Sequence, residues 1–212
     1  MTELPAGTAI EGASGAAHRG RTAAASREQV LDLATDRYLR GRRVDVQAIA
    51  NELGLGRTTV YRWFGSRDEL IGEVIVRAAE PLLAQSRAEA RGTGGAALLD
   101  TFDRFNRSLA DAPALRRFVE RERDAALRVI TSGAGNVQPR IVAMMTALIE
   151  QEVSSCAYRP PVEPPTLGYA LVRLGEAFLF NEAVAGMRGD VERLRDVEAA
   201  LLGVSAGGRG PG

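Results

Sequence analysis

The amino-acid sequence predicts an all-α protein. Apolar residues recur at spacings of three and four through most of the chain, and no segment shows a convincing alternation of period two, which is typical of strands. Most of these periodic segments also begin at a capping residue or end at a glycine or proline. We therefore expect a short N-terminal unit of three helices, followed by a longer helical domain.

The first helix follows a segment without apolar periodicity. Residues 1–25 are rich in Gly, Ala and Ser, so we expect a disordered arm. A helix is then predicted to begin at Arg27, because Ser26 and Gln29 form a capping box, and to stop at Gly41. Its inward stripe consists of Val30, Leu31, Ala34 and Tyr38.

Two short helices around a glycine turn are predicted next. Asp45 is an N-cap for the first of them, which should end at Gly54 because glycine accepts the left-handed backbone that reverses the chain. The second is predicted over residues 57–63, and Gly65 ends it. Such a pair is a helix-turn-helix motif, whose second helix enters the major groove in many DNA-binding proteins.

The outer face of the second helix suits double-stranded DNA. It carries no acid and consists of Arg57, Thr58, Thr59, Tyr61, Arg62 and Trp63. Arginine can pair with guanine, threonine can contact a thymine methyl group, and tyrosine or arginine can hold phosphates. Between Arg19 and Arg67 there are ten arginines and five acids, a local charge of +5 in a chain whose net charge is zero. The alternative is an ordinary solvated face of a helical protein.

Residues 27–71 resemble the DNA-binding domain of the TetR family of bacterial transcriptional repressors. The resemblance rests on Ile49-Ala50, on Leu53-Gly54 and on the run from Thr59 to Phe64. It implies a helix-turn-helix domain over residues 26–70.

The resemblance also implies roles for individual residues. The residues expected to face bases are Arg57, Thr58 and Thr59. Those expected to contact the phosphate backbone are Tyr61, Trp63 and Arg67, and Arg62 can do either. In the preceding loop, Arg42 and Arg43 are further candidates for phosphate contacts. Asp45 and Gly56 depart from the family, which usually places hydroxyl residues at these two caps.

The rest of the chain reads as one helical domain over residues 71–204, with a disordered tail over residues 205–212. Helices are predicted over residues 70–89, 96–110, 113–129, 137–158, 166–185 and 190–204. Pro81 predicts a kink or break near residues 79–80. The proline-rich residues 159–165 should form a stiff connector.

The resemblance assigns two tasks to this C-terminal domain, effector binding and dimerisation. The segment 166–185 is apolar nearly all round, so we expect it to form a homodimer contact together with residues 190–202. A pocket for a small-molecule effector is expected among Phe102, Phe105, Asn106, Phe118, Met144, Met145, Leu148, Tyr169 and Arg173. A stripe of Phe and Met at helical spacing is also compatible with plain core.

The expected function is that of a ligand-responsive transcriptional repressor. It would bind a near-palindromic operator as a homodimer and be released by a small, largely apolar effector. Residues 169–186 are similar to those of TetR-type regulators that control the degradation of quorum-signalling lactones, which favours a lactone among the effectors. An alternative is an architectural or activator protein with a filled second domain and no effector.

Enzymatic function is not expected. His18 and Cys156 are the single histidine and cysteine, so a catalytic Ser-His or Cys-His pair, a disulfide and a His/Cys metal site are all disfavoured, and no cofactor is predicted. The acid/base candidates of a helical enzyme would be Glu120, Glu122, Glu150 and Glu152. The sequence begins with no signal peptide and holds no membrane-spanning run, so we expect a cytoplasmic protein without a membrane partner.

Overall fold

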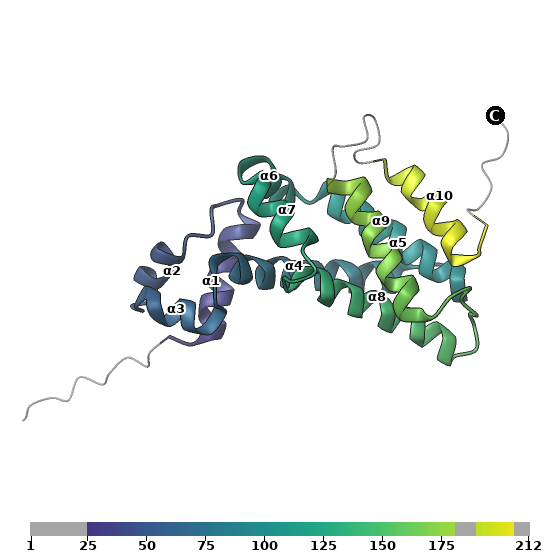
Figure 1. The fold of residues 1–212 in the computed structure, drawn as a ribbon, viewed down its shortest axis with the longest axis horizontal. Coiled ribbons are helices and arrows are strands. Elements are labelled where there is room, and N and C mark those ends of the chain that lie inside the picture. The colour runs from purple at the N-terminus through teal and green to yellow at the C-terminus, as the bar shows by residue number, and fades with distance from the viewer. Residues whose placement is uncertain (1–24, 181–189, 206–212) are drawn as a thin grey trace, which may run out of the picture.

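The fold is all-α, as predicted. The computed structural model describes residues 25–180 and 190–205, and these form ten helices and no strand (Figure 1). Nearly all of the predicted arm and tail, and the last residues of the predicted helix 166–185, lie outside the described residues.

The N-terminal unit consists of α1 (Arg27–Leu39), α2 (Val46–Glu52) and α3 (Arg57–Phe64). The predicted caps are confirmed, since Ser26 forms its capping box and the Asp45 carboxylate accepts from the Ala48 amide at 2.9 Å. Gly65, which ends α3, has φ +77°, and a Cβ there would lie 1.9 Å from the Glu69 carboxylate. This turn therefore requires glycine.

A single long helix, α4 (Arg67–Glu89), connects this unit to the rest of the molecule. It runs through Pro81, so the predicted break is wrong. Pro81 lies on the exposed face of α4, where water can hydrate the carbonyl of Arg77 that loses its N–H partner. The N-terminal half of α4 is also held against α1, because Arg77 pairs with Glu28 at 2.7 Å and with Asp32 at 2.8 Å.

Six further helices complete the fold. They are α5 (Gly94–Asp111), α6 (Pro113–Arg121), α7 (Arg123–Thr131), α8 (Val137–Ser154), α9 (Pro164–Phe180) and α10 (Val191–Leu202). The helix predicted over residues 113–129 is two helices, because the backbone of Glu122 leaves the helical region at φ −135° and ψ 49°. The predicted connector ends early, since α9 already begins at Pro164, where a proline suits the first helical turn.

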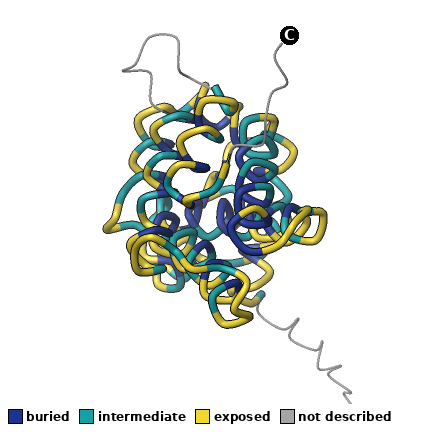
Figure 2. Tube along the Cα trace, turned by 90° about the vertical axis from the view of Figure 1, so that its right-hand side faces the viewer, coloured by how far each residue is buried: buried dark blue, intermediate teal, exposed yellow. Residues whose placement is uncertain are grey.

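The hydrophobic core does not divide at residue 70. One cluster joins the helix-turn-helix unit to the start of α4 and to α6 and α7, and a second joins the end of α4 to α5, α8, α9 and α10. Figure 2 shows the buried residues lying between the helices throughout. At the junction, the ring of Phe118 on α6 meets Tyr38 of α1 edge to face, with centroids 6.3 Å apart. The two domains therefore share packing as well as the long helix.

Replacing Phe118 with Ala tests this shared core. We expect Phe118→Ala to lower the free energy of unfolding by about 3–5 kcal/mol, because it removes a buried ring and leaves a cavity. The matched control is Leu39→Ala, whose side chain is 56% exposed. It should change stability by about 0.5 kcal/mol or less. Urea unfolding at fixed protein concentration measures both, and equal midpoints for the two variants would contradict the shared core.

Candidate DNA-binding surface and ligand cavity

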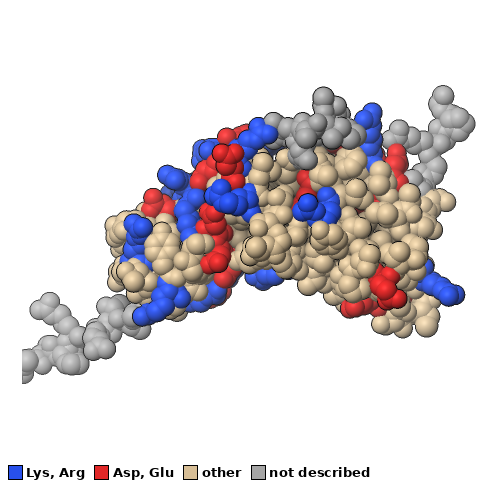
Figure 3. All heavy atoms as spheres, viewed as in Figure 1, with Lys and Arg blue, Asp and Glu red and all other residues tan. Residues whose placement is uncertain are grey.

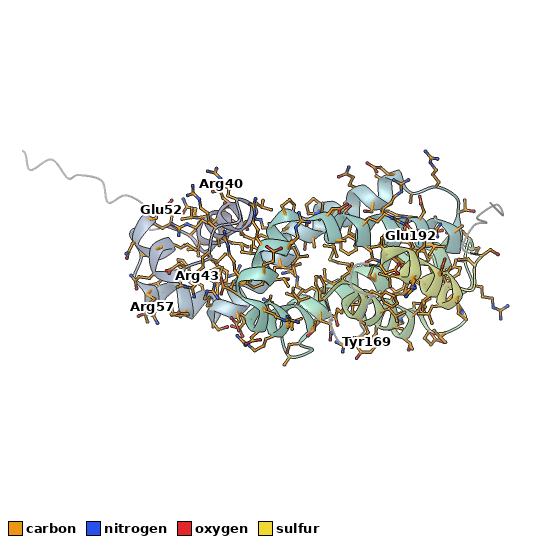
Figure 4. The ribbon with its side chains drawn as sticks, turned by 90° about the horizontal axis from the view of Figure 1, so that it is seen from above. Arg40, Arg43, Glu52, Arg57, Tyr169 and Glu192 are labelled. Carbon is orange, nitrogen blue, oxygen red and sulfur yellow. The ribbon has the colours of Figure 1, made fainter. Side chains whose placement is uncertain are left out.

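Helix α3 presents the predicted DNA-binding face at one end of the molecule. Val60 and Phe64 are buried and anchor the helix, whereas the opposite face is accessible to different degrees. Its exposed residues are Arg57, Thr58 and Arg62, and its half-buried residues are Thr59, Tyr61 and Trp63. The guanidinium carbon of Arg57 lies 5.1 Å from the centre of the Tyr61 ring, and Figure 4 shows Arg57 at the outer end of this unit. The sequence-predicted set on α3 is thus brought onto one helix surface.

Ion pairing distinguishes these arginines from their neighbours. Arg37 of α1 pairs with Glu52 at 2.5 Å, and Arg40, which directly follows α1, pairs with Asp36 at 2.9 Å. Within residues 25–66, the arginines for which the described residues provide no acidic partner are Arg42, Arg57 and Arg62. Figure 3 shows basic side chains around α1–α3, bordered by a mixed band of acids and bases toward the second domain. The uncompensated positive charge of the N-terminal unit therefore lies on α3 and in the loop before α2.

Arg67 has a different environment from the other predicted contacts. Its Nε donates to the Val44 carbonyl at 2.8 Å, and its two terminal nitrogens contact the two Glu122 oxygens at 2.9 and 2.8 Å. Arg43 approaches the same carboxylate at 3.6 Å while remaining exposed. Arg67 is thus engaged within the chain, where it joins the helix-turn-helix unit to the junction of α6 and α7.

The two departures from the family pattern have a structural explanation at one position only. The Asp45 carboxylate caps α2, and this hydrogen bond from the Ala48 amide lowers the pKa of Asp45. Gly56 forms no side-chain cap at α3. Neither residue offers a hydroxyl to a phosphate, so backbone contacts near these caps fall to the neighbouring arginines.

A cavity lies inside the C-terminal domain. Its volume is about 70 Å³. Helices α4 to α10 all contribute to its wall, which is largely apolar. Four residues of the predicted pocket line it, namely Phe102, Phe105, Asn106 and Met145. Such a narrow apolar space with few polar groups is typical of a site for a small ligand.

The other five predicted pocket residues do not line this cavity. Phe118 packs with Tyr38 in the first core cluster. Met144 and Leu148 are half-buried and pack on the second core cluster without reaching the cavity. Tyr169 is 51% exposed and projects outward in Figure 4, and Arg173 is exposed and pairs with Glu176 at 2.7 Å.

The sequence reasoning missed three polar residues of the wall. Gln138 donates to Glu176 at 2.9 Å. Glu198 accepts from the Asn106 amide at 2.9 Å and is only 2% exposed. A signal for Glu198 was present, because it stands four residues from both Leu194 and Leu202, on the inward stripe of its helix.

The acids considered for an enzyme have structural partners or lie on the surface. Glu152 pairs with Arg87 and accepts from the Gly94 amide at 2.8 Å, so it joins the end of α4 to the start of α5. Glu122 holds Arg67, while Glu120 and Glu150 are exposed. Within residues 25–180 and 190–205, no three potential metal ligands cluster, and no helix is long and apolar enough to cross a membrane.

Burial should make the stability of the fold depend on pH through Glu198. Desolvation raises the pKa of Glu198 from 4.5 to about 8, against the hydrogen bond from Asn106, with Asp103 adding to the rise and Arg195 opposing it. Burial also raises the pKa of Glu176 on neighbouring α9, against the hydrogen bond from Gln138 and the charge of Arg173. Between pH 4.5 and about pH 8, Glu198 keeps its proton in the folded chain but has lost it in the unfolded chain. The stabilisation present at low pH therefore disappears as the pH rises toward 8.

Glu198→Gln tests this linkage because the amide cannot ionise. The loss of unfolding free energy between about pH 5 and about pH 8 should be smaller in the variant than in the unmodified protein. Urea unfolding at both pH values measures it. Equal pH dependence in the two proteins would show that Glu198 titrates normally.

Comparisons with known proteins agree with this architecture. Residues 93–203 match the family model described as the tetracyclin repressor-like C-terminal domain. The structure of QsdR, a TetR-family transcriptional repressor of R. erythropolis, superposes with a TM-score of 0.80 at 29% identity, covering 87% of this chain and 97% of QsdR.

A second solved structure shares the fold. It is that of AlkX, a TetR-family repressor of Dietzia sp. strain DQ12-45-1b implicated in biodegradation of n-alkanes, with a TM-score of 0.58 at 24% identity, covering 84% of this chain and 96% of AlkX. No curated protein matches the chain. The family model spans more than half of the 212 residues and fits the helical domain behind the helix-turn-helix unit, so this protein belongs to the TetR family of transcriptional regulators.

Proposed function

We propose that this protein represses transcription by binding a near-palindromic DNA operator as a homodimer, and that a small, largely apolar effector releases it. The observation that carries the proposal is the distribution of unpaired charge. Among the residues that the structure describes, Arg57 and Arg62 have no acidic partner and lie on an acid-free face of α3, while other arginines of the same unit are paired. The unpaired guanidinium groups, which can bind phosphates and base edges, therefore lie on the helix that would enter the major groove.

The docking mode follows from the resemblance to the TetR family. Arg57, Thr58 and Thr59 are assigned to bases, and Tyr61 and Trp63 to the phosphate backbone, with Arg62 able to serve either. Arg42 and Arg43 precede α2 on the exposed surface and are assigned to phosphates. Arg67 is assigned a supporting role, because its guanidinium already holds Val44 and Glu122.

A homodimer would place two copies of α3 in successive major grooves, about 34–36 Å apart. The outward surface of α8 and α9 fits a subunit contact, since its exposed residues include Ala143, Ala147, Tyr169 and Ala177. Helix α10 fits this task less well than the sequence suggested. It buries Leu194 and Leu202 within its own chain, and its exposed face carries charged residues.

The cavity is assigned to the effector. Leu115 on α6 and Ile130 on α7 line it and also belong to the core cluster of the helix-turn-helix unit. A ligand that displaces these helices would therefore shift the packing of Phe118 on Tyr38, and with it the position of α3. The resemblance of residues 169–186 to regulators of lactone degradation supports a lactone as one candidate effector. The open cavity favours this reading over an architectural protein with a filled domain.

Arg62→Ala tests the DNA surface. It should weaken operator binding by about 1–3 kcal/mol if Arg62 reads a base, or lower the slope of affinity against salt by about one if it holds a phosphate. Arg40→Ala is the matched control, because Arg40 is also exposed but is paired with Asp36 and lies on the opposite side of the unit from Arg57 (Figure 4). Fluorescence anisotropy with selected operator DNA measures both. Equal effects of the two changes would contradict the assigned surface.

Gly175→Val tests the cavity. Gly175 lines it, and a Cβ there would meet only Asn106 Oδ1 at 3.5 Å, an ordinary contact. The valine side chain should therefore occupy ligand space without displacing the helix backbone. We expect unchanged operator affinity but loss of release by effectors that act on the unmodified protein, with Gly175→Ala showing a weaker loss. Retained release by Gly175→Val would place the effector elsewhere.

A further inference from the structure

The carboxyl group of Glu198 is incompletely hydrogen-bonded at the wall of the cavity. Its Oε1 accepts from the Asn106 amide at 2.9 Å, and the side chain is 2% exposed. Its Oε2 is buried and has no hydrogen-bond partner in the part of the chain that the structure describes. A buried polar atom without a partner is unfavourable in a folded protein, so its presence at a cavity indicates a position that a ligand completes.

Two other polar side chains of the wall, Gln138 and Glu176, bond to each other and to neighbouring groups of the protein. Gln138 donates to Glu176 at 2.9 Å and to the Thr131 carbonyl at 3.2 Å. Glu176 also accepts from Arg173 at 2.7 Å. The remaining wall consists mainly of apolar side chains such as Phe102 and Phe105. Among the described residues that line the cavity, Glu198 therefore holds the buried side-chain atom that lacks a partner, within apolar surroundings.

The charges around Glu198 favour its neutral form. From α5 it faces Asn106 and Asp103, and from its own helix it faces Arg195, whose Nε lies 3.7 Å from the Asp103 carboxylate. On α9 the nearest acid of the wall is Glu176, which Arg173 already compensates. No cation donates a hydrogen bond to Glu198 among the described residues.

The proton of Glu198 therefore has a defined place. Burial raises the pKa of this carboxyl to about 8, so near neutral pH it holds a proton. Since Oε1 accepts from Asn106, the proton is carried by Oε2, which becomes a hydrogen-bond donor.

We propose that the cavity binds an uncharged ligand with an apolar body and one carbonyl oxygen, and that this oxygen accepts a hydrogen bond from Glu198. The proposal rests on the assignment of the cavity to the effector. A cationic ligand would need an ionised Glu198 in this apolar wall, and an anionic ligand would lose its hydration there without a cation among the lining residues to pair with it. A hydrocarbon would leave Oε2 without a partner. An ester or ketone satisfies Oε2 and fits the apolar wall.

The test uses four probes of equal carbon number, butyl acetate, hexylammonium, hexanoate and hexane. Their affinities are measured by the shift of the Asn106 side-chain amide resonance in the full chain. Butyl acetate should bind most tightly. Glu198→Leu should weaken the binding of butyl acetate about tenfold, because it removes the hydrogen bond. The affinity for hexane should stay the same or rise. Glu198→Gln keeps an N–H donor and should retain most of the affinity.

Three results would overturn the proposal. The first is tighter binding of hexylammonium or hexanoate than of butyl acetate. The second is an equal loss of affinity for butyl acetate and for hexane in Glu198→Leu. The third is the absence of butyl acetate binding to the unmodified protein. Circular dichroism of both variants checks that they fold, and Glu198→Gln provides the comparison if Glu198→Leu does not.

Titration in the presence of operator DNA separates this inference from the proposed function. If butyl acetate binds through Glu198 but does not release DNA, the ligand class stands and the effector assignment fails. If a charged probe releases DNA and Gly175→Val blocks that release, the repressor mechanism stands and the ligand class proposed here is wrong.

Discussion

The packing of α6 and α7 against the helix-turn-helix unit is the constraint on which the rest of the structure depends. Phe118 reaches Tyr38 of α1, and the break at Glu122 turns α7 back along α4. The same pair of helices lines the cavity through Leu115 and Ile130. A change in cavity volume therefore acts on side chains that also hold α1, since close-packed interiors transmit displacement rather than absorb it.

Charge is organised by pairing rather than by composition. All 27 basic residues are arginine, and the N-terminal unit carries an excess of them. The local sum of +5 is a poor guide to the DNA-binding surface, because several of these arginines fix α1 to α2 or hold Glu122. What distinguishes Arg57 and Arg62 is the absence of an acid within reach among the described residues. Unpaired charge is available to phosphate, whereas paired charge is largely compensated.

The cavity and the pocket predicted from residue types share only some of their residues. Aromatic and methionine residues were expected in the wall, yet Phe118 serves the junction and Tyr169 faces outward. The informative residue is an acid on an apolar stripe, Glu198, whose burial would be unfavourable without Asn106. An inward acid is the kind of departure from pattern that marks a binding site more clearly than a further Phe does.

Local chemistry fixed the helix ends in the first third of the chain, as Ser26, Asp45 and Gly65 show, because capping bonds and positive φ depend on residues a few positions apart. The acid-free face of α3 was predictable too, because the residues that share a helix face are also only a few positions apart. Tertiary structure alone decided that Arg67 binds Glu122, that α4 continues through Pro81, and that Glu198 meets Asn106 across 92 positions. These outcomes depend on which helices pack together and which faces meet water, and neither is encoded within a single turn of helix.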